Sequence, residues 1–420
     1  MENNFIFSKY EFVDTTLKLY YETDNYKFVE EIDFKKAPSD DKKNALERAF
    51  KYLHLMAGVS YYKSFLPKNI IVKTCKLNIE EADFLNNLYF NGLGEFSYRN
   101  KVLLDIKFPS DLKINIENSI QNDVKLSNNT IIPIGGGKDS IVVYNMLKSQ
   151  YPDKQFYTFS VNTARPIKDC CDAIGEKNIL VSRKIATTLL ELVKNGDCYN
   201  GHVPISAIIA LISVCVGIIY DCNTTAIANE KSANVGNVEW QGRLVNHQWS
   251  KSYEAEKSLH DFIQKYILSS YNYYSSIRSY YEIAIAKKFS ELKQYHQVFS
   301  SCNRNFKITD KKEEKVWCCD CPKCRFVYLM LSPFMKKQDM VEIFGKNMLN
   351  DETQLVGYEE LAGLQGCKPF ECVGEIEESA LAFLLLKGSE YENDFVVKNI
   401  CEKLKYDVEK LKKEYLSDLL

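Results

Sequence analysis

The sequence has almost no net charge of either sign, because 54 Lys and Arg residues balance 56 Asp and Glu residues to a formal charge of −2. Proteins that bind nucleic acids through bulk electrostatics carry a clear basic excess, so no nucleic-acid partner is expected. The first residues lack the basic region and the long apolar run of a signal peptide, so a cytoplasmic location is expected. Internal repeats and low-complexity linkers are also missing, and the 420 residues predict two or three domains.

One apolar run, over residues 203–220, has about the length needed to cross a lipid bilayer. Pro204 stands near its start, Ser206 and Ser213 lie within it, and a second apolar run begins at residue 224. A buried helix between two strands accounts for all of these features. The sequence therefore predicts no membrane insertion.

Glycine makes up only 18 residues, but three of them stand together between an apolar run at 130–134 and an apolar run with helical spacing. This order predicts a strand, a tight loop and a helix, and the loop residues are Gly135, Gly136, Gly137, Lys138, Asp139 and Ser140. Glycines allow a sharp turn and a close approach to a ligand, and the N–H groups of such a loop converge on an anion. Asp139 can hold Mg²⁺, and Ser140 can donate to a phosphate oxygen. The loop is therefore a candidate site for the phosphates of a nucleotide, and Lys138 is a further candidate contact.

The spacing of this loop differs from the Walker loop and from the dinucleotide fingerprint. It resembles the pyrophosphate-binding loop of the PP-loop ATPases, which reads Ser-Gly-Gly-x-Asp-Ser. Gly135 stands where that family usually has the first Ser, so this chain lacks one hydroxyl group of the pattern. The resemblance implies that the nucleotide is ATP.

Strand-like and helix-like segments alternate from residue 130 to residue 228. The predicted strands are 130–134, 155–161, 178–182 and 224–228, and the predicted helices are 140–149, 166–175 and 203–220. This alternation is typical of an α/β fold with a parallel sheet and helices on both faces. Ligands of such sheets bind beyond the carboxyl ends of the strands, where Ser160 is another candidate contact to the nucleotide.

The chain divides into three predicted parts. Residues 1–120 predict a separate α+β domain, with hairpin strands before residue 34 and helices at 45–65 and 80–98. The ATP-binding α/β domain is predicted at 121–300. Residues 301–420 are predicted to form a mostly helical region that also carries a cluster of cysteines.

Five of the 14 cysteines lie between residues 302 and 324. Cytosolic thiols stay reduced, so the clustering indicates a metal site instead of disulfides. A C-x-x-C-x-x-C run with one distant cysteine suits a tetrahedral zinc ion, and the predicted ligands are Cys302, Cys318, Cys321 and Cys324. Cys319 is expected to point elsewhere. An iron–sulfur cluster and a set of unmetallated core thiols are the alternatives.

This arrangement of cysteines, followed by Arg325, resembles the zinc site of the 7-cyano-7-deazaguanine synthases. Those proteins are also PP-loop enzymes, and they activate a carboxylate with ATP. A closed site of four thiolates stabilises the fold and leaves no open position for chemistry. The zinc ion is therefore expected to be structural.

Several further blocks match one PP-loop family more closely. They are residues 94–100, 134–140, 200–204, 229–240, 245–252, 299–306, 317–326 and 368–375. In combination they resemble the UDP-N-acetylmuramoyl-L-alanyl-L-glutamate epimerases (the MurL family) over most of the chain, with Cys319 where that family usually has Gly. The resemblance implies that the terminal L-glutamate of a UDP-muramoyl dipeptide is inverted to D-glutamate through an acyl-adenylate. ATP and Mg²⁺ would be required, AMP and pyrophosphate would be released, and the product would serve peptidoglycan synthesis.

Within these blocks, several side chains are candidates for the chemistry. His202 and His247 are candidates for acid/base work because imidazole titrates near neutral pH, and Cys372 is a further candidate base. Glu230 is a candidate for a second metal contact or for a contact to substrate. The cations that can bind the UDP diphosphate or the glutamate side chain are Arg243, Lys251, Arg304 and Arg325.

The sequence leaves three other functions open. One is an enzyme like the deazaguanine synthases, which forms an amide or a nitrile on an activated carboxylate. The others are a PP-loop protein that modifies tRNA and a PP-loop binding module without activity. Solvent deuterium at the product Cα would separate an epimerase from the first alternative. The sequence does not determine the oligomeric state.

Overall fold

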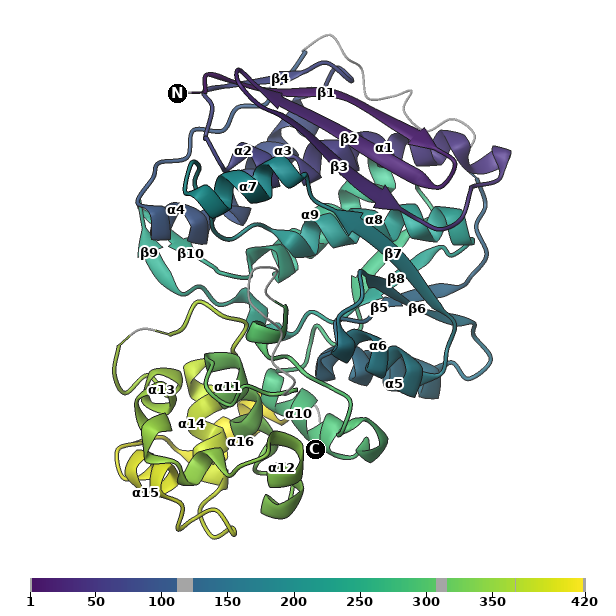
Figure 1. Ribbon diagram of the computed structural model, residues 1–420. Helices are drawn as coiled ribbons and strands as arrows, with labels where there is room; N and C mark the ends of the chain where they lie inside the picture. The colour runs from purple at the N-terminus through teal and green to yellow at the C-terminus, as the bar shows by residue number, and fades with distance from the viewer. Residues whose placement is uncertain (1, 112–123, 307–315, 367, 418–420) are drawn as a thin grey trace.

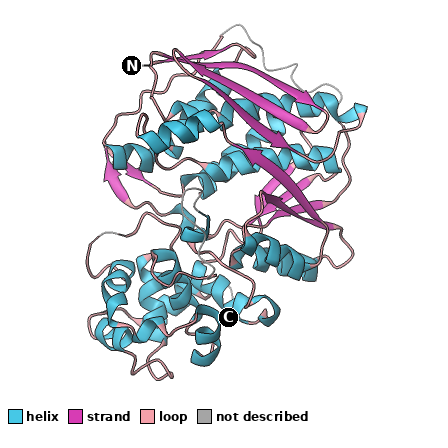
Figure 2. Cartoon of the chain, in the orientation of Figure 1, coloured by secondary structure: helices cyan, strands magenta, loops and turns pink. Residues whose placement is uncertain are grey.

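The structure, a computed structural model, describes residues 2–111, 124–306, 316–366 and 368–417. Its main feature is one mixed sheet of nine strands in the order β11-β8-β5-β6-β7-β3-β2-β1-β4 (Figure 1, Figure 2). The strands are β1 (Asn4–Val13), β2 (Thr16–Thr23), β3 (Lys27–Asp33), β4 (Asn69–Val72), β5 (Thr130–Pro133), β6 (Phe156–Val161), β7 (Asn178–Lys184), β8 (Thr224–Ile227) and β11 (Asn272–Ser275). A separate two-stranded sheet pairs β9 (Val238–Trp240) with β10 (Arg243–Val245).

The half of the sheet from β11 to β7 is parallel. Neighbouring residues of β5 enter opposite cores, since Ile131 packs in the core that contains α8 (Ile205–Tyr220) and Ile132 packs in the core that contains α5 (Lys138–Gln150). Burial on both faces is what a parallel sheet between two helical layers requires. The prediction of an α/β fold with a mostly parallel sheet and helices on both faces is confirmed, and the seven predicted elements agree with the structure within a few residues.

The other half of the sheet comes from the N-terminal residues and is largely antiparallel. The strand β3 pairs with β7, with Glu31 opposite Lys184 and Asp33 opposite Ser182. The predicted hairpin strands therefore extend the parallel sheet directly. Every second residue of β2 is buried, as expected for a sheet that is covered on one face. The predicted boundary at residues 120–121 lies outside the described residues, and the division into three domains stays a prediction.

Two hydrophobic cores lie on opposite sides of the parallel half. The first core holds α8 and the helices α1 (Lys43–Ala57), α2 (Val59–Tyr62), α3 (Ile79–Gly92), α4 (Gly94–Asn100), α7 (Thr187–Asn195) and α9 (Tyr253–Tyr266). Helix α8 packs against α1, β5 and β8, so the prediction that residues 203–220 form a buried helix is confirmed. In the part of the chain that the structure describes, no helix combines the length and the apolar character needed to cross a membrane.

The second core joins the parallel sheet to the C-terminal region, drawn in green and yellow in Figure 1. Its helices are α5, α6 (Arg165–Ile174), α10 (Glu282–Ser290), α11 (Pro322–Leu331), α12 (Lys337–Phe344), α13 (Leu355–Leu361), α14 (Ile376–Leu385), α15 (Phe395–Cys401) and α16 (Val408–Tyr415). Helix α10 contacts both α5 and α11, and this packing brings the C-terminal region to the carboxyl end of β5.

A substitution in α8 should test the packing of the first core. A Cβ atom at Gly217 would lie 2.3 Å from the Tyr271 hydroxyl oxygen. Tyr271 cannot move aside easily, because it is fully buried and its hydroxyl group lies 2.7 Å from Thr225 Oγ1 and donates to the Ser213 carbonyl at 3.2 Å. Gly217→Ala should therefore lower the free energy of unfolding by about 1–3 kcal/mol, measured by urea denaturation. Gly135→Ala is the control for stability, because a Cβ there meets no atom within 4 Å.

Candidate active site

A cavity of about 320 Å³ lies at the carboxyl ends of β5 and β8. Its wall includes Gly135, Gly137, Asp139, Ser140, Asn229, Lys251, Lys323 and Cys372. These residues come from the loop after β5, the start of α5, the segment after β8, the short helix η4 (Trp249–Lys251) and the C-terminal region. The cavity therefore occupies the place where parallel α/β sheets bind their ligands, and its volume is that of a small-molecule site.

The glycine loop of this cavity turns sharply. Gly136 has a φ of +85°, which residues with a side chain rarely adopt. A Cβ at Gly136 would lie 3.2 Å from the backbone of Pro166 and Ile167, and one at Gly137 would lie 2.6 Å from Ser301 Oγ. Gly137 is the N-cap of α5, so the unpaired N–H groups of the first helical turn lie at the cavity wall. A helix start of this kind attracts an anion such as a phosphate.

Three carboxyl groups meet at the start of α5. Asp139, Glu230 and Glu282 each offer one oxygen atom, and these atoms lie within 4.8 Å of one another. The ammonium group of Lys138 pairs with both Asp139 and Glu282. Lys323 Nζ also lies 3.5 Å from Glu282 Oε1, so the direct ion pairs of the cluster involve Asp139 and Glu282.

Among the described residues, Glu230 is the acid of this cluster whose negative charge has no direct ion-pair partner. It is 2% exposed, and among the described residues its Oε2 atom has no hydrogen-bond partner. Burial raises the pKa of the Glu230 carboxyl group, because the charged form loses its hydration. A buried, unpaired carboxylate oxygen beside two further carboxylates fits a hard divalent cation such as Mg²⁺.

Three predicted nucleotide contacts, Gly136, Lys138 and Ser160, are not residues of the cavity wall, and two of them have side chains that point elsewhere. The side chain of Lys138 is 1% exposed and turns toward Asp139 and Glu282. Ser160 is 3% exposed, and its Oγ accepts a hydrogen bond from Asn178 Nδ2 at 3.2 Å. Direct contact of these two side chains with a phosphate stays a prediction that the observed packing does not support.

A second polar cluster adjoins the cavity and contains both predicted histidines. Glu95 Oε2 contacts His247 Nδ1 and lies 3.3 Å from His202 Nδ1, and the two imidazole ring centres are 4.8 Å apart. Burial would lower the pKa of His247, but hydrogen bonds with Cys372 and Glu95 outweigh it and raise the pKa to about 9. Burial and the neighbouring His247 lower the pKa of His202 to about 4. Near neutral pH, His247 is therefore protonated and His202 is neutral.

The predicted basic side chains separate into two groups. Lys251 lies in the cavity wall, and its Nζ is 3.8 Å from Cys372 Sγ. Arg243, Arg304 and Arg325 are not wall residues. Arg243 donates to a backbone carbonyl of α3 at 2.9 Å, while Arg304 and Arg325 pair with Asp320 at 2.7 and 3.3 Å. Substrate binding by these three arginines stays a prediction.

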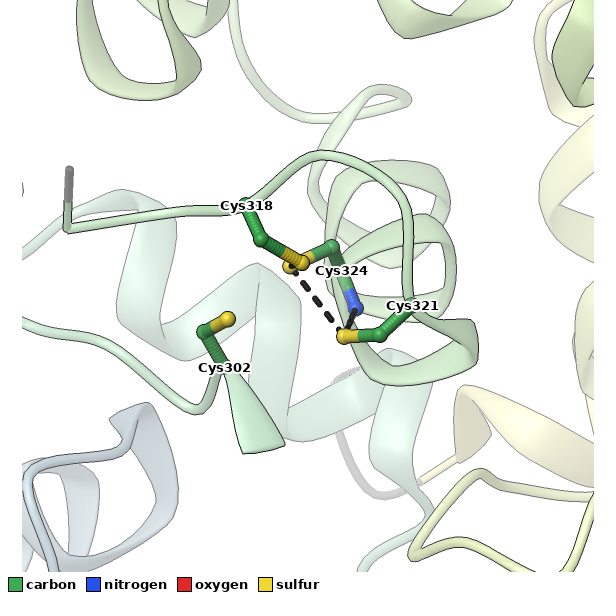
Figure 3. A group of neighbouring side chains, drawn as sticks. All are labelled: Cys302, Cys318, Cys321 and Cys324. Atoms are coloured by element: carbon green, nitrogen blue, oxygen red, sulfur yellow. Dashed lines mark hydrogen bonds between the residues drawn. The ribbon is translucent and has the colours of Figure 1, made fainter. Parts of the chain in front are cut away.

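The four predicted zinc ligands lie together (Figure 3), and none of them is a residue of the cavity wall. The Sγ atoms of Cys302, Cys318, Cys321 and Cys324 lie within 4.8 Å of one another, and Cys321 and Cys324 begin α11. Sulfur–sulfur distances of 3.4 and 3.7 Å fit a tetrahedral ion, since Zn–S bonds of about 2.3 Å place ligand atoms about 3.8 Å apart. Cys319 turns away as predicted, and its thiol donates to the Phe344 carbonyl at 3.1 Å.

Glu95, Lys323 and Glu282 also belong to the site, but the sequence did not predict a role for them. Glu95 and Lys323 lie inside recognisable blocks, where their charge was the available signal. Glu282 starts an ordinary amphipathic helix, and no local pattern distinguishes it. It joins Asp139 only because α10 packs on α5.

Comparison with known proteins agrees with this architecture. Residues 1–276 match the model of the MurL N-terminal domain, and residues 298–415 match that of the MurL C-terminal domain. The UDP-N-acetyl-alpha-D-muramoyl-L-alanyl-L-glutamate epimerase of Xanthomonas oryzae pv. oryzae is 38% identical over 358 residues, which cover 84% of this chain and 78% of that protein. A Micromonospora protein with the same name is 38% identical, covering 85% and 78%, and one from Salinispora tropica is 37% identical, covering 83% and 75%. The chain belongs to the MurL family.

Proposed function

We propose that this protein inverts the terminal L-glutamate of UDP-N-acetylmuramoyl-L-alanyl-L-glutamate to D-glutamate in an ATP-dependent reaction. The names of the three relatives support the substrate and the epimerisation. The glycine loop at the N-terminus of α5 supports a PP-loop type of ATP site. The proposed products are AMP, pyrophosphate and a D-glutamyl dipeptide for peptidoglycan synthesis, made in the cytoplasm.

ATP addresses the main chemical difficulty of this reaction. The Cα–H bond of glutamate lies beside a carboxylate, and its deprotonation would place two negative charges on adjacent groups. Conversion of the carboxylate to an acyl-adenylate removes one charge and lets the carbonyl oxygen accept the electron pair. Each unit by which the pKa of the Cα–H group falls lowers the cost of deprotonation by about 1.4 kcal/mol. Reprotonation on the opposite face and hydrolysis of the adenylate give the product.

The cavity supplies groups for each part of this reaction. The N–H groups at Gly135–Ser140 would bind the phosphates, and Ser140 lies in the wall as a hydroxyl donor. Asp139, Glu230 and Glu282 would hold Mg²⁺, which neutralises the charge of a leaving pyrophosphate when it is bound. The ammonium groups of Lys251 and Lys323 offer further positive charge at the same wall.

One observation carries the proposal: the glycine loop, Asp139 of the carboxylate cluster and the Cys372 thiol line a single cavity. The glycine loop serves phosphate binding, and the carboxylates serve metal binding. The thiol serves as the base that removes a proton beside an activated carboxyl group. An enzyme that only forms an amide or a nitrile needs no such base.

Incubation with the UDP-muramoyl dipeptide should test the reaction directly. We expect D-glutamate to appear by chiral chromatography only when both ATP and Mg²⁺ are present, with pyrophosphate released and solvent deuterium at the product Cα. Omission of ATP, or its replacement with a non-cleavable α,β-methylene analogue, is the control. Epimerisation without ATP, or ATP cleavage without deuterium incorporation, would contradict the proposed function.

A further inference from the structure

The Cys372 thiol has an unusual position for a cysteine. Among the described residues that line the cavity, Cys372 is the one cysteine, and it lies in the segment that precedes α14. Its Sγ atom lies 3.8 Å from the Lys251 ammonium group, and the imidazole of His247 is a second neighbour that stabilises its negative charge. The ammonium group of Lys323 donates to the backbone carbonyl of Cys372 itself.

Three cationic groups therefore lie near Cys372, one of them at its backbone carbonyl, and they come from separate elements. Lys251 belongs to η4, His247 follows β10, and Lys323 belongs to α11. Lys323 is fixed further by Glu282 at 3.5 Å.

Glu95 completes a chain of contacts behind the thiol. Its Oε2 atom contacts His247 Nδ1, and its Oε1 atom accepts a hydrogen bond from Arg99 Nε at 2.5 Å. Glu95 is 6% exposed, so its interaction with His247 is only weakly screened by water. The order Glu95–His247–Cys372 thus places a carboxylate, an imidazole and a thiol in sequence from the protein interior to the cavity.

The charges favour an ionised thiol. Burial alone would raise the pKa of Cys372, but Lys251, His247 and Lys323 outweigh it and lower the pKa to about 7. A thiolate is both a stronger base and a stronger nucleophile than a thiol. A base whose pKa lies near the working pH is also the most effective in proton transfer.

We propose, building on the proposed function, that the Cys372 thiolate is the catalytic base that removes the α-proton of the activated glutamate. The Cα–H bond breaks, an S–H bond forms, and the electron pair moves into the acyl-adenylate as its enolate. Inversion follows when water supplies a proton to the opposite face. Glu95 and His247 are positioning residues, because they hold the thiolate and do not need to touch the substrate.

The other titratable groups suit this role less well. His202 is neutral and lies behind Glu95, outside the cavity wall. Glu230 and Asp139 belong to the acidic cluster that fits Mg²⁺. The positive charge of Lys251 is stabilised by Cys372 and by Glu230, which raise its pKa, so its amine is not available as a base.

Two variants separate this role from the proposed function. In Cys372→Ala and Cys372→Ser, solvent deuterium incorporation at Cα should fall by at least about 10²-fold, while dipeptide-dependent pyrophosphate release continues. Cys198→Ala, at a half-buried thiol outside the cavity wall, should behave like the unchanged protein. Undiminished deuterium incorporation in Cys372→Ala would overturn the assignment. Loss of pyrophosphate release in the unchanged protein would instead overturn the proposed function.

A chemical measurement keeps the proposal testable if those variants fold poorly. Iodoacetamide should modify Cys372 with a rate that rises through a midpoint near pH 7, with no substrate present. Cleavage after Glu371 separates Cys372 from Cys367 for mass spectrometry. Glu95→Gln should move this midpoint upward by about half a pH unit or more, because His247 loses the carboxylate that keeps it charged.

Three results would contradict the assignment of Cys372 as the catalytic base. One is an alkylation midpoint above pH 8.5, as in a free thiol, and another is a midpoint that Glu95→Gln leaves unchanged. The third is a glutamyl thioester on Cys372 in protein that is first incubated with ATP and substrate and then denatured. Such a thioester would make the thiol a nucleophile instead of a base.

Discussion

Asp139→Asn is expected to reduce ATP-dependent epimerisation by about 10³-fold or more, because one oxygen ligand and one negative charge leave the proposed Mg²⁺ site. Asp139 is the member of the cluster that also lies in the cavity wall. The substitution keeps the size of the side chain, and Lys138 keeps its second partner, Glu282. Pyrophosphate release and chiral analysis of the glutamate should fall together, while the melting temperature changes little.

The control for this variant is Asp153→Asn. Asp153 is an exposed acid in the turn before β6, away from the cavity, and its replacement should leave both rates unchanged. A rise in the Mg²⁺ concentration needed for half-maximal activity in Glu230→Gln or Glu282→Gln would support the same cluster. Full activity of Asp139→Asn at an unchanged Mg²⁺ requirement would reject the metal role.

The second large effect concerns the cysteine cluster. Removal of its metal should destabilise the C-terminal region by about 5 kcal/mol or more, since structural zinc sites contribute about 10–16 kcal/mol in isolated zinc-finger peptides. Cys302 and Cys324 are both fully buried, and Cys321 and Cys324 start α11, whose side chains occupy the second core. Cys324→Ser should therefore lose the bound zinc and lower the melting temperature by about 10 °C or more.

Cys319→Ser is the matched control for the cluster. A serine hydroxyl can keep the hydrogen bond to the Phe344 carbonyl, and residue 319 does not face the other four sulfur atoms. Elemental analysis should give one zinc per chain in this variant and in the unchanged protein, and none in Cys324→Ser. Bound iron with visible absorbance would identify an iron–sulfur cluster, and a metal-free protein of unchanged stability would leave the thiols as core residues.

The sequence predicted the parts of the site that depend on short spacings. The triple glycine, Asp139 and Ser140 are consecutive, so the strand, loop and helix around them fix their arrangement. The run Cys318–Cys324 likewise places three candidate ligands in one turn and at the start of one helix. The alternation of strand-like and helix-like segments from residue 130 predicted the parallel half of the sheet. The spacing of apolar residues that distinguishes a strand from a helix is contained within each short segment.

The sequence was less informative where distant segments meet. Packing buries Ser160 against Asn178 and turns Lys138 toward carboxylates, so direct contact of these two side chains with a nucleotide stays a prediction. The pairing of β3 with β7, which extends the sheet with the N-terminal strands, follows from no local pattern. Glu282 is a candidate metal ligand only because the fold places it beside Asp139.

The sequence by itself determined the α/β fold, the tight glycine loop before α5 and the grouping of the four cysteines, because these follow from the hydrophobic period, the backbone freedom of glycine and the short spacing along the chain. Only the tertiary structure decided which groups share the cavity. It brought Glu282 to Asp139 and set Glu95, His247 and Cys372 in contact across more than one hundred residues. Burial and the charges of these neighbours, which no single segment contains, then determine the pKa of each group.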